Sequence, residues 1–170
     1  MKKLFLLSFL VFSCGFFYYP LSNESYNKDK KKEKIENSFR PKKNIYGDTN
    51  KNFFQIFLNN LFIGFLLSIL GFLSGGLLTI LILFWNGYLL SIVYSMAFYS
   101  LNITDILYYS KHIPIELFAL MLFSNIGYKG FYFYKDFLIN RNLTKTYLPK
   151  ISDFIIPISL LFISSIIESL

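Results

Sequence analysis

The sequence contains few charged residues and only one cysteine, one histidine and one tryptophan. Charged residues make up 16% of the 170 residues, whereas soluble domains carry about 25%. The single cysteine, Cys14, cannot form a disulfide within the chain, so cysteine content does not identify the redox compartment. With only one histidine, the chain lacks a standard zinc motif. We therefore expect no metal site, no cofactor, no catalytic residue and no enzymatic activity.

Charge is missing altogether from one long part of the chain. Between Lys51 and Asp105 there is no Asp, Glu, Lys, Arg or His, and this run is long enough for two membrane spans of about 20 residues each. A soluble protein has no solvent-free place for such a run. Four long apolar segments can be marked, at 53–73, 76–100, 113–134 and 151–169. We predict an all-α, multi-pass transmembrane helical bundle with four core spans plus an N-terminal signal or anchor helix.

The N-terminal segment allows three interpretations. Met-Lys-Lys followed by a run of apolar residues is typical of a secretory signal peptide, and the same residues are long enough for a short transmembrane anchor. The run Val11-Phe12-Ser13-Cys14 also resembles a bacterial lipobox, which would make Cys14 a lipid-modified N-terminus. We divide the chain into a signal peptide or anchor at 1–19, a hydrophilic, disordered outer segment at 20–52 and a four-span membrane domain at 53–170.

The basic residues predict which end of the bundle faces the cytoplasm. The stretch 129–150 carries five basic residues and one acid, so the positive-inside rule places it in the cytoplasm of a bacterial cytoplasmic (inner) membrane. Alternating spans then put 20–52, 101–112 and the C-terminus outside, and the turn near 74–76 inside. Against this, 20–52 carries nine basic residues, so the inverted topology stays open. We expect no nucleic acid partner, because aromatic residues do not interleave with these charges at regular spacing.

Small residues form a stripe along each of the first two core spans. Four residues at intervals of three or four positions share one face of the first span: Asn60, Gly64, Ser68 and Gly71. Small side chains let helices approach closely in lipid, and Gly87 begins a similar stripe in the second span. We expect the two spans to pack as a tight antiparallel hairpin, with Gly87 as a contact point and Asn86 hydrogen-bonded to a neighbour.

The order of these features resembles the stage II sporulation protein M family. The resemblance covers about residues 52–170 and rests on an Asn-Asn pair, the glycines, an Asn-Gly pair, a His-x-x-x-Glu helix and a closing Ile-Ile-Glu-Ser. The residues that match the family are Asn60, Asn86, Gly87, His112, Glu116, Ala119, Gly127, Gly130 and Glu168. Family members often read His-Gly-x-x-Glu-Leu-Pro-Ala, whereas this chain has Ile113 and Phe118 in place of the Gly and the Pro. The resemblance implies a multi-pass bacterial membrane protein that organises peptidoglycan-degrading partners.

Four polar residues from three helices are predicted to meet at the outer ends of the spans: Asn60, His112, Glu116 and Glu168. Pro114 suits the first turn of a helix, so His112 and Glu116 lie at the outer edge of the third core span. Glu168 ends the fourth core span on the same side, and Asn60 lies about two turns in from the outer end of the first. We expect a shared polar pocket with Glu116 as the central acceptor, able to hold a proton, a cation or a basic partner segment. The plainer alternative is that Glu116 only caps its helix.

Three functions are compatible with these features. The leading interpretation is a non-enzymatic scaffold or anchor that positions envelope, peptidoglycan-remodelling proteins. The alternative is a membrane subunit of a transporter or permease whose polar membrane residues line a path. An intramembrane hydrolase ranks last, because no Ser-His pair has a recognisable spacing. Expected partners are the lipid bilayer and other membrane or envelope proteins, and a homo-oligomer stays open. Family relatives also occur in bacteria that form no spores, so the resemblance does not by itself imply sporulation.

Overall fold

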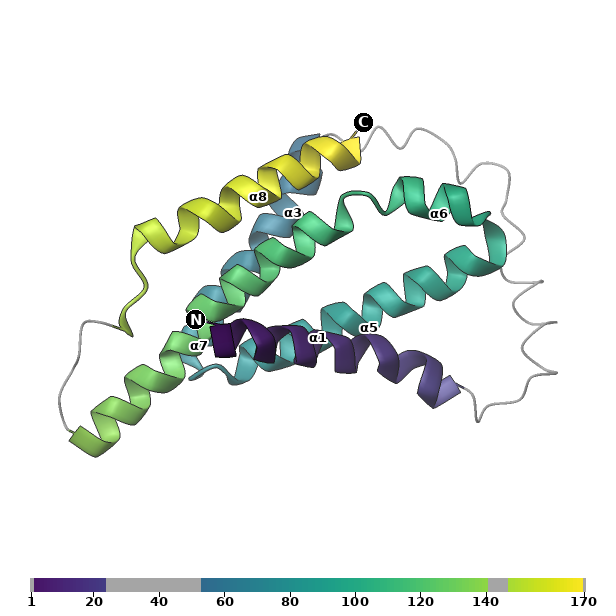
Figure 1. The fold of residues 1–170 in the computed structure, drawn as a ribbon. Helices are drawn as coiled ribbons and strands as arrows, with labels where there is room; N and C mark the ends of the chain where they lie inside the picture. Colours follow the sequence, from purple (N-terminus) through teal and green to yellow (C-terminus); the bar gives the residue numbers. More distant parts are fainter. Residues whose placement is uncertain (1, 24–52, 141–146, 170) are drawn as a thin grey trace.

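The computed structural model describes residues 2–23, 53–140 and 147–169, and these residues form helices without strands (Figure 1). In chain order the elements are α1 (Lys2–Asn23), α3 (Phe53–Phe65), the π-helical η1 (Leu66–Leu70), α4 (Gly71–Leu73), α5 (Leu77–Ser100), α6 (Ile103–Tyr109), α7 (Ile113–Asn140) and α8 (Ile151–Ser169). The predicted all-α fold is confirmed. The predicted disordered segment 20–52 lies outside the described residues from residue 24 onward, as do residues 141–146 of the basic stretch.

Within the described ranges, four helices are long and apolar enough to cross a membrane, and a bent pair makes a fifth candidate span. The four single spans are Lys3–Pro20, Phe53–Leu73, Leu77–Phe98 and Ile151–Ser169. The bent pair joins α6 to α7 at an angle of 44°. The predicted multi-pass bundle is therefore confirmed. α7 continues to Asn140, past the predicted end at 134. The first part of the basic stretch 129–150 is therefore helical.

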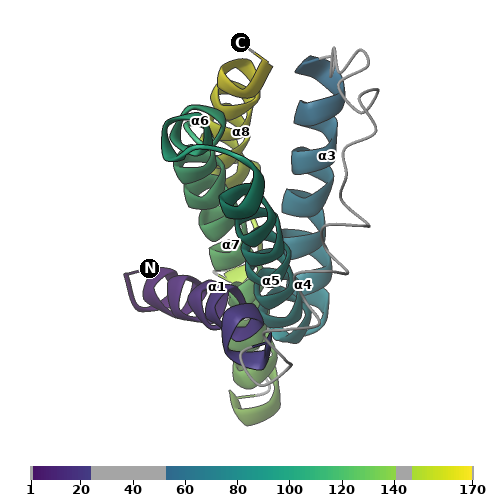
Figure 2. The same ribbon diagram turned by 90° about the vertical axis from the view of Figure 1, so that its right-hand side faces the viewer.

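The candidate spans alternate in direction. In Figure 1 the turn between α4 and α5, the end of α7 and the start of α8 lie toward the left. The start of α3, the short helix α6 and the end of α8 lie toward the upper right. Figure 2 shows α3, α7 and α8 packed side by side, with α1 crossing the bundle at a large angle to α3. The described part of 101–112 and the end of α8 thus share one end of the bundle, as the sequence predicts.

Two glycines build the turn between the first two core spans. Gly75 and Gly76 have φ angles of 63° and 90°, a left-handed region that glycine adopts without steric cost. The N–H of Gly76 donates to the carbonyl oxygen of Gly71 at 2.7 Å, which ends α4 and lets α5 begin at Leu77. The turn predicted near residues 74–76 is confirmed.

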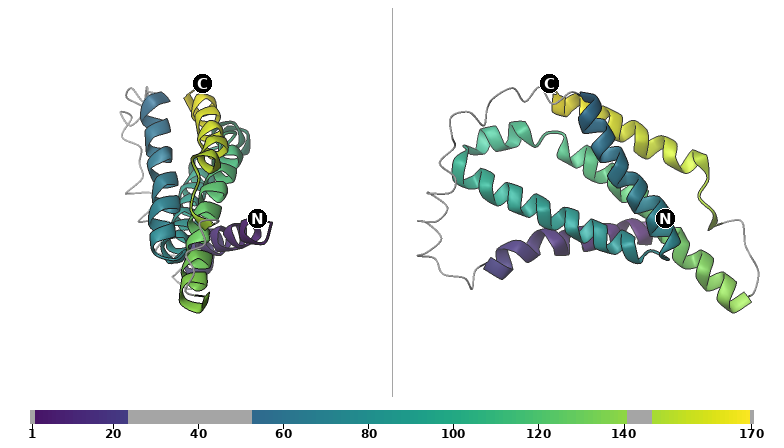
Figure 3. Two further views of the ribbon diagram at one scale, coloured as in Figure 1. Left: turned by 90° about the vertical axis from the view of Figure 1, so that its left-hand side faces the viewer. Right: turned by 180° about the vertical axis from the view of Figure 1, so that it is seen from behind.

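The small-residue stripe of the first core span packs against α7. A Cβ added at Gly64 would lie 2.6 Å from the ring of buried Phe123, and one added at Gly71 would lie 3.2 Å from the Cα of Gly127. Ser68 is fully buried on the same face and donates to the Gly64 carbonyl at 2.9 Å. Figure 3 shows from behind how α3 and its continuation lie across α7. The prediction that this stripe contacts another helix is confirmed.

The stripe of α5 has a different partner from the one predicted. A Cβ added at Gly87 would lie 2.3 Å from the carbonyl oxygen of Phe12, and one added at Gly15 would lie 2.1 Å from the carbonyl oxygen of Phe84. α1 and α5 therefore approach each other backbone to backbone. The predicted hairpin forms next to its turn, where Thr79 of α5 meets Gly71 and donates to the Leu67 carbonyl at 3.0 Å. Farther from the turn the two stripes do not face each other, because α7 covers Gly64 and α1 covers Gly87. Gly87 is nevertheless a contact point, as expected.

α1 is an integral part of this packing. Ser8 on α1 lies inside the bundle, where its Oγ is 2.6 Å from the Oγ of Ser124 on α7. Cys14 is exposed on the outside of α1. Cleavage of a signal peptide after residue 19, or before a lipid-modified Cys14, would remove the Ser8 contact. An uncleaved anchor would keep this contact.

The core of the molecule surrounds the first half of α7. It consists of buried apolar side chains from four spans: Leu67, Leu83, Ala119, Leu120, Phe123, Ile126 and Leu161. At the other half of α7, Lys129 Nζ donates to Asp153 Oδ2 in the first turn of α8 at 2.6 Å. The same carboxylate oxygen accepts the N–H of Lys150 at 3.0 Å. The Lys129–Asp153 ion pair thus joins the second half of α7 to the first turn of α8.

Candidate functional site

The bend between α6 and α7 places the only histidine at the entrance of a span. His112 is the last residue before α7, and its carbonyl oxygen accepts the first N–H groups of that helix, from Ile115 at 3.1 Å and Glu116 at 3.2 Å. Pro114 occupies the first turn, as predicted, where its missing N–H is not needed. Because Glu116 follows His112 by four residues, both side chains lie on one face of the same helical turn.

The end of α8 brings the third polar group to this place. Ser164 is fully buried, and its Oγ donates to the carbonyl oxygen of His112 at 3.2 Å. This hydrogen bond ties the first turn of α7 to α8. Glu168 follows Ser164 by four residues on α8, so its side chain points in the same general direction. The local geometry of two helices thus directs Glu168 toward His112.

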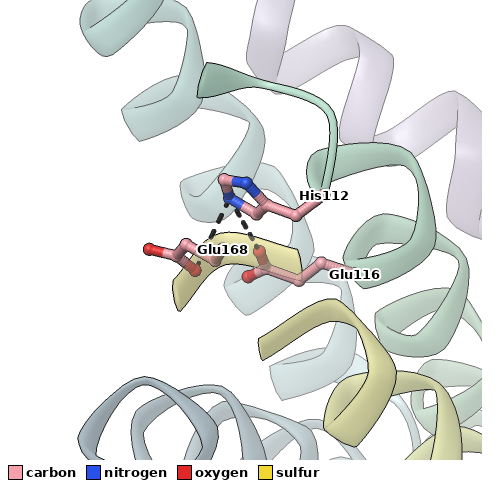
Figure 4. A group of neighbouring side chains, drawn as sticks. All are labelled: His112, Glu116 and Glu168. Carbon is pink, nitrogen blue, oxygen red and sulfur yellow. Dashed lines mark ion pairs between the residues drawn. The ribbon is translucent and has the colours of Figure 1, made fainter. Parts of the chain in front are cut away.

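The three side chains converge around the imidazole (Figure 4). His112 Nε2 lies 3.5 Å from Glu168 Oε2 and 3.9 Å from Glu116 Oε2. One ligand atom from each residue lies within 4.8 Å of the others. The side chains are 13%, 20% and 23% exposed for His112, Glu116 and Glu168. Both carboxylates approach His112, so the imidazole lies beside Glu116, the predicted central acceptor, and beside Glu168.

α3 completes a polar cavity over these groups. The cavity has a volume of about 260 Å³ and is lined by Gln55, Ile56, Asn59, Asn60, His112, Glu116 and Glu168. All four residues of the predicted polar cluster therefore line one cavity. Gln55 and Asn59 were not predicted as part of it. Their spacing of four residues, next to Asn60, is the sequence signal that could have placed them there.

A second, larger cavity meets the polar one at the same three residues. It has a volume of about 390 Å³, and apolar side chains of α1, α5, α6 and α7 form most of its wall. His112, Glu116 and Glu168 line both cavities. Asn86 also lines the larger one, and its Nδ2 donates to the Ile82 carbonyl of the preceding helical turn at 2.8 Å. The expected hydrogen bond of Asn86 to a neighbour is thus a bond within α5.

This arrangement concentrates negative charge beside apolar helices. A carboxylate that is partly removed from water needs a proton, a basic group or a metal ion close by. The imidazole and two carboxylates offer the ligand atoms that divalent metals bind in proteins. Glu168 comes from the far end of the chain, so no motif of residues near in sequence contains all three side chains. The absence of a sequence motif therefore does not exclude a metal site here.

A family model described as stage II sporulation protein M matches residues 4–170, nearly the whole chain. The chain belongs to the stage II sporulation protein M family. No match was found among curated proteins or among solved structures. The matched region begins earlier than the predicted resemblance at 52–170 and includes α1. α1 is thus part of the family's common region as well as of the packed bundle.

Eight of the nine residues that carried the resemblance to the stage II sporulation protein M family fall into two structural groups, and the ninth, Asn86, lines the larger cavity. One group lines the polar cavity: Asn60, His112, Glu116 and Glu168. The other lies where helices touch: Gly87, Ala119, Gly127 and Gly130. Where this chain departs from the family pattern, Phe118 packs its ring against Phe5 of α1, with centroids 5.3 Å apart. Family membership and the apolar helices together indicate a multi-pass membrane protein.

Proposed function

We propose that this protein is a non-enzymatic scaffold in the bacterial cytoplasmic membrane that positions peptidoglycan-remodelling proteins of the envelope. The observation that carries the proposal is the distribution of the described residues. Every described helix of eight or more residues belongs to a candidate span, and the described links between spans are short. The described part of the chain thus contains no water-soluble catalytic domain, and work on the cell wall falls to partner proteins. Membership of the stage II sporulation protein M family agrees with such a role.

Gene deletion in the source bacterium tests the scaffold function. Fluorescent fusions of its peptidoglycan hydrolases should lose their normal positions in the deletion strain and regain them when the wild-type gene is restored. A photo-crosslinking residue at Tyr108 of α6, which is 58% exposed, should capture one of these hydrolases. The same residue at Leu138, at the other end of the bundle and 77% exposed, serves as the control. Unchanged hydrolase positions and unchanged peptidoglycan turnover in the deletion strain would contradict the scaffold proposal.

The polar cavity favours a second candidate, a membrane subunit of a transporter. Ionisable groups within membrane spans commonly line substrate or ion paths, and His112, Glu116 and Glu168 lie between a polar and an apolar cavity. A transporter subunit predicts a defect in uptake or export in the deletion strain while hydrolases keep their positions. The same deletion strain therefore separates the two functions.

The orientation of the bundle gives a direct prediction about labelling. Lys129, Lys135 and Lys150 mark the end that the positive-inside rule places in the cytoplasm. We expect a membrane-impermeant maleimide to label Tyr109→Cys in intact cells, and Leu148→Cys only after the cells are permeabilised. Both residues are exposed, at 64% and 41%, and Cys14→Ser is introduced into both variants to remove the native thiol. The reverse labelling pattern would place the polar cavity on the cytoplasmic side.

A further inference from the structure

We propose that His112, Glu116 and Glu168 bind a divalent transition-metal ion of the zinc class. The donor atoms are one imidazole nitrogen and two carboxylate oxygens, which are common ligands of Zn²⁺ and of Fe²⁺ or Mn²⁺. Among the described residues, these three bring one donor atom each to within 4.8 Å of the other two. The site is distinct from the scaffold function proposed above and does not depend on it.

The distances between the donor atoms fit a shared ion better than a direct hydrogen bond. Nitrogen and oxygen ligands bind zinc at about 2.0–2.1 Å, so two ligands at a tetrahedral angle lie roughly 3.4 Å apart. His112 Nε2 lies 3.5 Å from Glu168 Oε2 and 3.9 Å from Glu116 Oε2. A charge-assisted hydrogen bond between a nitrogen and a carboxylate oxygen is shorter, at about 2.7–2.9 Å. All three donor atoms lie within 4.8 Å of one another, so the carboxylates would move closer together to share one ion.

A divalent ion also balances the charge of the site. Metal binding requires the two carboxylates to be ionised and the imidazole to be neutral, and this ligand set carries a charge of −2 beside the apolar wall of the larger cavity, where uncompensated charge is costly. A divalent cation makes the group neutral. A single lysine or arginine side chain of a partner protein would neutralise only one of the two carboxylates. The metal ion is therefore the occupant that best suits a site at the edge of a membrane span.

The backbone already holds the three ligands in place. His112 and Glu116 share the first turn of α7, and Ser164 donates from α8 to the His112 carbonyl at 3.2 Å. Glu168 lies one turn further along α8. A metal ion bound to all three residues would clamp the start of α7 to the end of α8. Ser164 acts as a positioning residue, because it contacts the backbone of a ligand and no ligand atom.

The polar cavity leaves room for further ligands. Its volume of about 260 Å³ exceeds the roughly 30 Å³ that one water molecule occupies in the liquid. The amides of Gln55, Asn59 and Asn60 line the same space and can hydrogen-bond to a metal-bound water. Three protein ligands with a fourth position open to water is a common form of zinc site.

Metal binding by the purified full-length protein tests the proposal. The protein is stripped with a chelator in detergent, titrated with Co²⁺ and monitored by visible absorption, and then loaded with Zn²⁺ and measured for bound metal. We expect a saturable Co²⁺ spectrum that Zn²⁺ abolishes, and about one Zn²⁺ per chain after removal of excess ion. This measurement needs no variant. A wild-type protein without saturable Co²⁺ absorption, or without retained Zn²⁺, overturns the proposal.

Variants then locate the ion. Ser164→Ala should weaken Zn²⁺ binding by about 10–100-fold at most, the contribution of groups that orient ligands, and Glu116→Gln and Glu168→Gln should each weaken it by a larger factor. Asp105→Asn makes the same chemical change on an exposed residue of α6 and should bind Zn²⁺ like the wild type. Size-exclusion chromatography confirms that each variant is folded. Equal Zn²⁺ affinity in the wild type and both folded glutamine variants would place the ion elsewhere and overturn the proposal.

Discussion

Replacing Gly127 with leucine is expected to prevent the folded bundle from accumulating in the membrane. A Cβ at this position would lie 2.3 Å from the carbonyl oxygen of Leu67 and 2.3 Å from Oγ1 of Thr79. These two oxygen atoms form a buried hydrogen bond, in which Thr79 donates to Leu67 at 3.0 Å. A leucine side chain would push α7 away from the first core span and from α5 together, and would break this bond.

The cost should exceed the roughly 1–3 kcal/mol that is typical of overpacked cores. The obstructing atoms belong to the backbone and to a fully buried threonine, which cannot rotate out of the way. Helices in lipid also lack a hydrophobic driving force that would restore their contact. Because a cost above about 1.4 kcal/mol shifts the folding equilibrium more than tenfold, we expect the yield of monodisperse protein in size-exclusion chromatography to fall by at least about tenfold.

Ser159→Leu is the matched control for this experiment. Ser159 is exposed on α8, and its Oγ donates to the Ile155 carbonyl of its own helix at 2.9 Å. A leucine there should face lipid, so the yield should stay close to that of the wild type. If Gly127→Leu and Ser159→Leu gave the same yield, the close crossing of α7 with the first core span would be contradicted.

The number and order of the spans were predictable because they depend on local composition. A run without charge between Lys51 and Asp105 requires membrane spans whatever lies elsewhere in the chain. The turn at Gly75 and Gly76 was predictable for the same reason, since glycine favours positive φ. The partners of the helices were not predictable. A stripe such as Gly64, Ser68 and Gly71 says that some helix approaches closely, but it does not say which one.

α1 shows how this ambiguity arises. The sequence predicts that the stripe of α5 packs against the first core span. In the structure, Gly15 of α1 and Gly87 of α5 instead let the backbones of α1 and α5 touch. From the sequence, residues 1–19 are also compatible with a cleaved signal peptide, and a cleaved segment would contribute no packing partner. The predicted partner of α5 therefore depends on whether the N-terminal segment stays in the membrane.

The polar cluster was predictable because the number of membrane crossings between two helix ends decides whether they lie at the same end of the bundle. An alternating topology puts the start of α7 and the end of α8 at one end of the bundle, so His112 and Glu168 are brought to the same level. The spacing of His112 and Glu116 gave their common face directly. The sequence could not indicate that His112 is the central group. That depends on the bend between α6 and α7 and on the hydrogen bond from Ser164.

The effect of Glu116→Gln on thermal stability is expected to depend on whether Zn²⁺ is present. In the metal-free protein, this change removes one of two carboxylates that lie close together and leaves the His112–Glu168 pair, with 3.5 Å between Nε2 and Oε2. The relief of repulsion should offset the loss of a favourable carboxylate at the start of a helix, which contributes about 0.3–1 kcal/mol. We therefore expect a midpoint of thermal unfolding at or above that of the wild type in the presence of a chelator.

With Zn²⁺ the order should reverse. An ion at 100 times its dissociation constant stabilises the folded state by about 2.7 kcal/mol, which corresponds to roughly 5–10 °C for a chain of this size. Glu116→Gln lacks one ligand, so its shift should be about half of this or less, and the loaded wild type should melt at the higher temperature. Thermal unfolding in detergent measures the midpoints of the wild type and of Glu116→Gln, each with and without Zn²⁺. Asp105→Asn, measured in the same way, is the control. A carboxylate that only caps α7 would destabilise the variant by the same amount with and without Zn²⁺, because the helix end is unchanged by the ion.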